Sequence, residues 1–142
     1  MKLSEWSDQQ MPAYGPQAWA RQMIVRAIGD LNTGEDPILF TTFAGATAEK
    51  ALTKSTAFAA LTVGLLTVVL TTDPTDSVDA RLELVIVPWA TVASSLRLEI
   101  AGDPDARLPA VVTVGEQTLE GRYDQRAVLT AFFLEASRLA GT

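Results

Sequence analysis

Hydrophobic and polar positions alternate with a period of two over much of the middle of the chain, which is the pattern of half-buried β-strands. The clearest example is the segment 81–87. Its even-numbered positions are leucine or isoleucine, and its odd-numbered face becomes apolar toward the end of the segment. We therefore expect residues 81–87 to form the central strand of a sheet, and Pro88 to end its pairing or to mark an edge.

Six further segments carry strand patterns and are separated by turn residues. They are residues 38–43, 57–63, 65–72, 96–100, 110–114 and 117–120. Gly64 permits a tight turn or bulge between the second and third of these, and Gly115 suits the first position of a two-residue hairpin loop. The spacing predicts about seven strands in a mainly antiparallel arrangement.

Two segments between the predicted strands have other patterns. Residues 44–56 are compatible with either a loop or a short helix, and residues 73–79 have the composition of a loop. The latter contain three aspartates, which raises the question of calcium. An EF-hand loop also needs a central glycine and a closing glutamate, which are missing here, so a solvated turn is the better interpretation.

Two segments have a helical period. Residues 16–31 begin at Pro16, which suits the first turn of a helix, and carry an apolar stripe on one side. Residues 124–140 follow a plausible N-cap at Asp124 and carry a wide apolar stripe that includes Phe132 and Phe133. Residues 1–15 show no period. We expect an N-terminal arm over 1–15 and a single domain over 16–142.

The amino-acid composition limits the classes of function that this chain can have. The chain has 142 residues, of which 48% are hydrophobic and 20% charged, as in ordinary folded domains. Its net charge of −6 weighs against nucleic-acid binding and against docking on anionic membranes. It has no cysteine and no histidine, which removes disulfides, the usual zinc ligands and a histidine base. We expect no cofactor and no metal.

The N-terminal segment has no apolar stretch typical of a signal peptide. The longest nearly apolar stretch, residues 57–70, is shorter than the roughly 20 residues that a membrane-spanning helix needs. We expect a cytoplasmic protein.

Two segments resemble bacterial pleckstrin-homology-like (PH-like) domains. Residues 60–69 (Ala-Leu-Thr-Val-Gly-Leu-Leu-Thr-Val-Val) are similar to a hairpin of that family, and residues 85–94 (Val-Ile-Val-Pro-Trp-Ala-Thr-Val-Ala-Ser) to an apolar strand followed by Pro and an aromatic residue. The resemblance covers about residues 38–140 and implies an α+β fold. Its core is an antiparallel β barrel or sandwich of about seven strands capped by the C-terminal helix. An extra N-terminal amphipathic helix precedes it.

The first functional hypothesis is a non-catalytic protein-binding or self-assembly module. Its partner is a second copy of the chain or another protein, and the family resemblance is compatible with dimers or rings. Large amphipathic aromatic rings dominate contact energies at interfaces. The candidate interface residues are Trp6, Tyr14, Trp19, Met23 and Trp89. The alternative for each tryptophan is ordinary packing in the core or at its rim.

Two other classes remain open. A peripheral lipid- or small-ligand-binding domain would use Lys50 and Lys54, although two lysines in an acidic chain are a weak signal. An enzyme would have to use carboxylates, and the local groupings are Glu35–Asp36 and the aspartates of residues 73–79. Adjacent carboxylates in solvated loops make poor acid–base pairs because their pKa values shift little.

Overall fold

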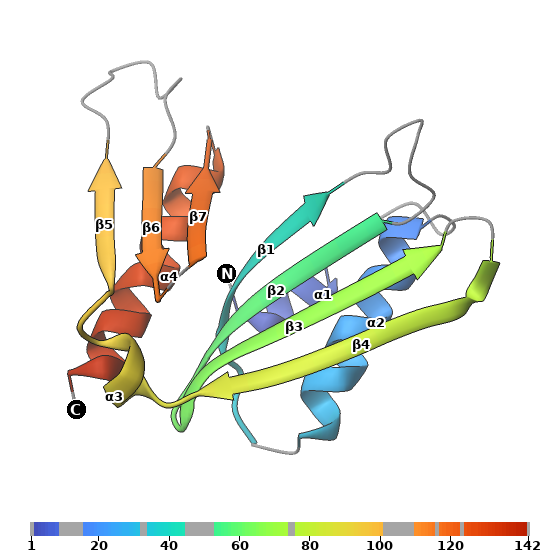
Figure 1. Cartoon of the computed structure of the whole chain (residues 1–142), viewed down its shortest axis with the longest axis horizontal. Coiled ribbons are helices and arrows are strands. Elements are labelled where there is room, and N and C mark those ends of the chain that lie inside the picture. The colour runs from blue at the N-terminus through green and yellow to red at the C-terminus, as the bar shows by residue number, and fades with distance from the viewer. Residues whose placement is uncertain are drawn as a thin grey trace.

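A computed structural model describes residues 2–8, 16–31, 34–44, 53–73, 76–100, 110–115, 117–122 and 124–141. The fold is mixed α+β, with two antiparallel sheets and a C-terminal helix (Figure 1). The larger sheet has four strands in the order β1-β2-β3-β4. They are β1 (Ile38–Ala44), β2 (Thr53–Leu61), β3 (Gly64–Asp73) and β4 (Asp76–Val87).

A two-residue turn at Thr62 and Val63 joins β2 to β3. The next residue has to be glycine because the turn lies against the end of β4. A Cβ atom on Gly64 would lie only 2.4 Å from the carbonyl oxygen of Val87. This close approach brings the β2–β3 hairpin tip beside the C-terminal end of β4.

The smaller sheet has three strands in the order β5-β6-β7. They are β5 (Arg97–Ile100), β6 (Ala110–Val114) and β7 (Gln117–Gly121). After Pro88, the short helix α3 (Trp89–Val92) leads from the larger sheet into β5. Gly115 follows β6 with a φ of 62°, a left-handed conformation that glycine adopts without strain. The backbone N–H of Gly115 donates a 2.8 Å hydrogen bond to Oγ of Ser95.

Three longer helical segments complete the chain. They are α1 (Leu3–Asp8), α2 (Pro16–Asp30) and α4 (Asp124–Ala140). The helix α2 covers one face of the larger sheet, whereas α4 contacts strands of both sheets (Figure 1). The larger sheet is therefore an inner layer, with α2 on one face and α4 with the smaller sheet on the other.

This layering produces two hydrophobic cores. The α2-side core contains Ile24 and Ile28 from α2 together with the sheet residues that face them. The α4-side core contains Leu129 and Phe132 from α4, together with residues of both sheets and α3. Strands β2 and β3 contribute to both cores, which explains their nearly continuous apolar sequence: strands that are buried on both faces do not alternate with polar residues.

The C-terminal helix and the antiparallel strands predicted from the sequence are confirmed. The helix predicted over residues 16–31 is observed as α2, and the one predicted over 124–140 as α4. All seven predicted strands are observed, with ends that differ by a few residues. Of the undecided segment 44–56, residue 44 ends β1 and residues 53–56 belong to β2, while 45–52 lie outside the described residues.

Three expectations need correction. Residues 81–87 belong to β4, an edge strand rather than a central one. The segment 73–79, expected as a loop, contributes the end of β3 and the start of β4. Within the described part of the chain, no β pairing joins the two sheets, so they do not close into a barrel. The PH-like assignment therefore remains a proposal, whereas the α+β class is observed.

The segment expected as an arm contains α1, which is attached to the chain just before β1. The Leu3 N–H donates to the carbonyl oxygen of Pro37 at 2.8 Å, and Lys2 forms an isolated bridge with Ile38. The Ser4 N–H donates to Oδ1 of Asp36 at 2.9 Å, and the Ser4 hydroxyl donates to Oδ2. These contacts explain why a short helix without a sequence period forms at this position.

The Asp36 contact predicts a local dependence on pH. The side-chain and backbone hydrogen bonds from Ser4 lower the pKa of the Asp36 carboxyl below its ordinary value. A lowered pKa in the folded state stabilises the fold above the unfolded pKa of about 3.9, and this contribution is lost as pH falls through the folded value. We expect the Ser4 amide NMR resonance to move as the pH falls below the unfolded pKa of about 3.9 and Asp36 becomes protonated. Asp36→Asn should abolish that movement, and an unchanged Ser4 resonance in the wild-type chain would contradict the assignment.

Candidate functional site

The outer edge of β4 has no neighbouring strand among the described residues. The strand pairs with β3 on its inner side, from Arg81 opposite Thr71 to Val87 opposite Leu65. At an edge strand, alternate backbone N–H and C=O groups point away from the sheet and are available to another strand. The backbone of β4 is therefore an open site for strand addition (Figure 1).

Three consecutive apolar residues on this edge remain exposed. The exposed fractions are 36% for Leu84, 45% for Val85 and 43% for Ile86. Leu84 pairs with Val68 and Ile86 with Leu66, on the face of the α2-side core, whereas Val85 lies on the opposite face. We call Leu84, Val85 and Ile86 the β4 strip. It presents apolar surface on both faces of an unpaired edge.

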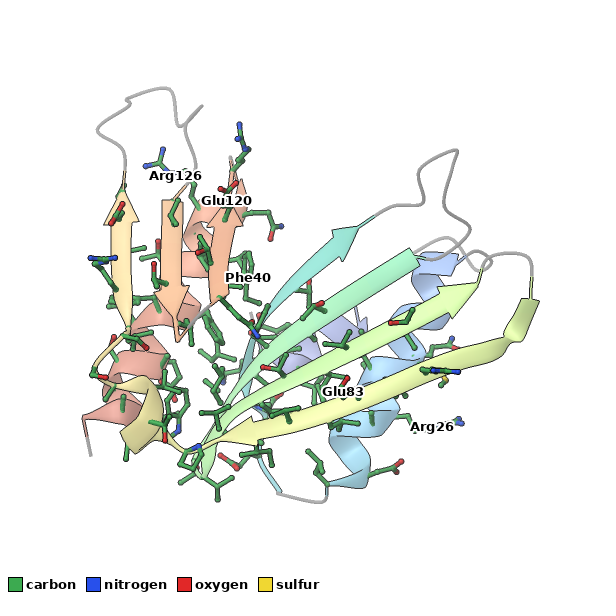
Figure 2. All side chains as sticks on the ribbon, in the orientation of Figure 1. Arg26, Phe40, Glu83, Glu120 and Arg126 are labelled. Carbon is green, nitrogen blue, oxygen red and sulfur yellow. The ribbon has the colours of Figure 1, made fainter. Side chains whose placement is uncertain are left out.

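Charged residues precede the β4 strip along the same strand. Arg81 and Glu83 are both exposed, and strand alternation places them on the same face as Val85. Figure 2 shows Glu83 on β4. Between them, Leu82 is half-buried against the α2-side core. Edge strands in monomers commonly carry charges that repel an approaching strand. Here the two charges have opposite sign, so they discriminate between partner strands instead of excluding them all.

The hairpin tip beside β4 is held in place by Glu35. The backbone N–H of Thr62 donates to Oε1 of Glu35 at 2.9 Å, and the Thr62 hydroxyl donates to the same oxygen. The neighbouring side chain of Val63 is 62% exposed. Glu35 thus fixes the turn that abuts the C-terminal end of β4, and it supports the site rather than offering a reactive carboxylate.

A second candidate site is a cleft between β7 and the strands β2 and β3. Its volume is about 390 Å³, and it is lined by Thr56, Phe58, Thr67, Val69, Gln117, Thr118 and Leu119. The polar groups in this lining are hydroxyls and one amide, and no lining side chain is charged. Such a lining suits a small uncharged ligand, because an anionic head group would lack a cationic partner there.

Of the sequence-predicted interface residues, the structure describes the side chains of Trp89 and Met23, which lie in different cores. Trp89 lies in the α4-side core, 7% exposed, and its Nε1–H donates a 2.7 Å hydrogen bond to the carbonyl oxygen of Leu61. Met23 is half-buried against the α2-side core. Trp6 and Trp19 belong to α1 and α2, and their side chains lie outside the described part of the structure, as does the whole of Tyr14.

The β4 strip was not predicted as a site, although the sequence contains two signals for it. The odd-numbered face of residues 81–87 becomes apolar toward its end, and Pro88 follows directly. An apolar second face was interpreted as burial in a central strand. A strand that is apolar on both faces and ends at a proline is equally compatible with an edge strand that pairs with another chain.

The other side chains that could carry chemistry either form structural hydrogen bonds or lie outside the described residues. Asp36 accepts hydrogen bonds from Ser4, as Glu35 does from Thr62. Lys50, and the side chains of Lys54 and of the aspartates in 73–79, lie outside the described residues. Within the described residues, no three acidic side chains are grouped closely enough to hold a metal ion. No helix in the described part of the chain is long and apolar enough to cross a membrane.

Comparison with family models, with curated proteins and with solved structures gave no match.

Proposed function

We propose that this chain is a cytoplasmic, non-catalytic protein-binding module of PH-like fold that assembles with itself through the outer edge of β4. The observation that carries the proposal is the β4 strip, three exposed apolar residues on an unpaired strand. An added strand gains backbone hydrogen bonds along the edge, and its side chains cover the apolar surface on both faces. The same contacts would bind a strand of another protein.

The placement of Trp89 supports an interface on β4 rather than on the aromatic residues. Its ring is part of the core and its N–H already has a partner, so it offers little surface to another protein. The three consecutive exposed apolar side chains are aliphatic and belong to β4. We therefore propose the β4 strip, rather than Trp89, as the interface.

The PH-like part of the proposal is supported by the order of the elements. Seven antiparallel strands are followed by a C-terminal helix that contacts both sheets, which is what the resemblance implies. The open cleft beside β7 favours a second candidate function, the binding of a small uncharged ligand. Its neutral lining offers no support for anionic lipid head groups, which need cationic side chains.

A lysine in the β4 strip tests self-assembly. We expect the wild-type chain to show an average mass that rises with concentration in light scattering, from low micromolar to hundreds of micromolar. Ile86→Lys should remain monomeric over that range, because a charge on the edge would be buried on pairing. Leu134→Lys is the matched control: Leu134 is 61% exposed on α4, away from the edge, and its replacement should leave association unchanged. A wild-type chain that stays monomeric contradicts the proposed function.

A further inference from the structure

Two charged positions of β4 become complementary when the strand is reversed about Leu82. The residues on either side of Leu82 are Arg81 and Glu83, which carry opposite charges. Both of these side chains are exposed on one face of the edge strand. In an antiparallel pair, residues directly opposite one another interact most strongly, and opposite charges there are favourable.

We propose that the strand added to the β4 edge is β4 of a second copy, paired antiparallel about a two-fold axis at Leu82. This inference rests on the proposed function and specifies its partner and register. The axis places Arg81 opposite Glu83 of the second copy and Glu83 opposite its Arg81. The pair therefore gains two cross-strand ion pairs by symmetry, and Leu82 faces its own counterpart on the other side of the sheet.

In the same register the β4 strip lies opposite residues 78–80 of the second copy. Leu84 lies opposite Ala80, Val85 opposite Asp79 and Ile86 opposite Val78. Leu82 is one of the two central residues of β4, which spans Asp76–Val87, so this register uses nearly the whole strand. The pairing of β4 with β3 on its inner side is irregular between Thr71 and Asp73.

The neighbouring register about Leu84 is less favourable. It would keep apolar pairs on the α2-side face but would set Glu83 opposite Val85 and Arg81 opposite Val87. The Glu83 carboxylates of the two copies are diagonal neighbours about either axis, so the registers differ in the two directly opposed ion pairs, which the axis at Leu84 loses. The charges on β4 therefore select the axis at Leu82 over the axis at Leu84.

The assembled unit joins two four-stranded sheets into one of eight strands. Because the axis is perpendicular to the sheet, the two α2 helices lie on the same face, and both smaller sheets lie on the other. A single strand–strand contact buries less area than a standard protein interface. We expect micromolar rather than nanomolar affinity, which fits a module whose assembly responds to concentration.

Cysteine cross-linking tests the register, and the absence of native cysteine makes each thiol unambiguous. Arg81→Cys and Glu83→Cys proteins are prepared separately and mixed before treatment with a short thiol cross-linker. We expect a cross-linked dimer from the mixture in severalfold higher yield than from either variant alone. Val85→Cys alone is the control, since its thiols would be roughly 20 Å apart across the axis.

Charge reversal tests the ion pairs. Arg81→Glu and Glu83→Arg should each weaken self-association roughly tenfold, because each sets two like-charged pairs across the axis. A mixture of the two variants should associate more tightly than either alone, since each chain then meets the opposite charge. The double variant R81E/E83R should recover wild-type association.

The outcomes separate the inference from the function on which it rests. Efficient cross-linking of Glu83→Cys with Val85→Cys would place the axis at Leu84 and overturn the inference, as would association that is insensitive to charge reversal. In both cases association abolished by Ile86→Lys would leave the proposed function intact. A wild-type chain that is monomeric at every concentration overturns both.

Discussion

Phe132→Ala is expected to lower the free energy of unfolding by about 3–5 kcal/mol. The Phe132 side chain is fully buried, and it belongs to the core that joins α4 to the two sheets. Removing its ring leaves a cavity that rigid strands on either side cannot fill, so the loss combines transfer free energy with the cost of the cavity. Domains of this size have a free energy of unfolding of about 5–15 kcal/mol, so the variant retains only a fraction of the wild-type stability.

The contact between Phe132 and Phe40 explains why the loss of stability in Phe132→Ala is not confined to α4. The two ring centroids are 6.5 Å apart and the ring planes are tilted by 42°. Figure 2 shows Phe40 on β1, a strand of the larger sheet. Since no β pairing joins the two sheets in the described structure, side-chain contacts of this kind hold them together.

Urea denaturation followed by circular dichroism measures the loss, and Leu134→Ala is its control. Leu134 lies two residues further along the same helix but is 61% exposed. Its replacement should change stability by less than about 0.5 kcal/mol. Equal losses in the two variants would mean that α4 does not pack in the observed orientation. The m-value should be similar in all three proteins if unfolding remains two-state.

The elements of this fold follow from local sequence signals. The period of two in the strands and the helical stripe that contains Phe132 each depend on neighbouring residues alone. Gly64 and Gly115 likewise mark the two tight hairpins, because each turn needs a residue without a side chain at that position. Such signals fix the kind and order of the elements, which is why these predictions were confirmed.

The position of each strand within a sheet depends on residues that are distant in the sequence. For this reason the prediction that residues 81–87 form a central strand was wrong. An apolar strand such as residues 81–87 has the same pattern whether its second face is covered by the same chain or by another one. The structure places it at an edge, with Val85 exposed on one face and Ile86 on the other. Barrel closure is equally non-local, since it requires pairing between strands of separate hairpins.

The burial of Trp89 could not be predicted from the sequence for a related reason. Large aromatic residues are frequent at interfaces, but they are also frequent in cores, and sequence alone does not separate the two environments for Trp89. The β4 strip consists of ordinary aliphatic residues, whose significance comes only from their exposure on an unpaired strand. Exposure is a property of the tertiary structure, so the site became visible only after the strand order was known.

Trp89→Ala is expected to destabilise the chain by about 3–5 kcal/mol, and Trp89→Phe by a smaller amount. The indole is 7% exposed and lies at the junction between the two sheets, where α3 follows β4. Alanine removes both the ring volume and the 2.7 Å hydrogen bond from Nε1 to the Leu61 carbonyl oxygen. Phenylalanine keeps most of the volume and loses only the hydrogen bond, which costs about 1–3 kcal/mol when a buried acceptor loses its partner.

The two variants together separate the contributions of packing and of hydrogen bonding to the junction. The free energy of unfolding from urea denaturation should be highest for wild type, lower for Trp89→Phe and lowest for Trp89→Ala. A phenylalanine variant as stable as wild type would show that the Leu61 hydrogen bond contributes no net stability. A loss below about 0.5 kcal/mol for Trp89→Ala would be typical of a surface residue, and would return Trp89 to the set of interface candidates. If Trp89 acts only in the core, destabilisation should also occur at dilutions where no dimer forms.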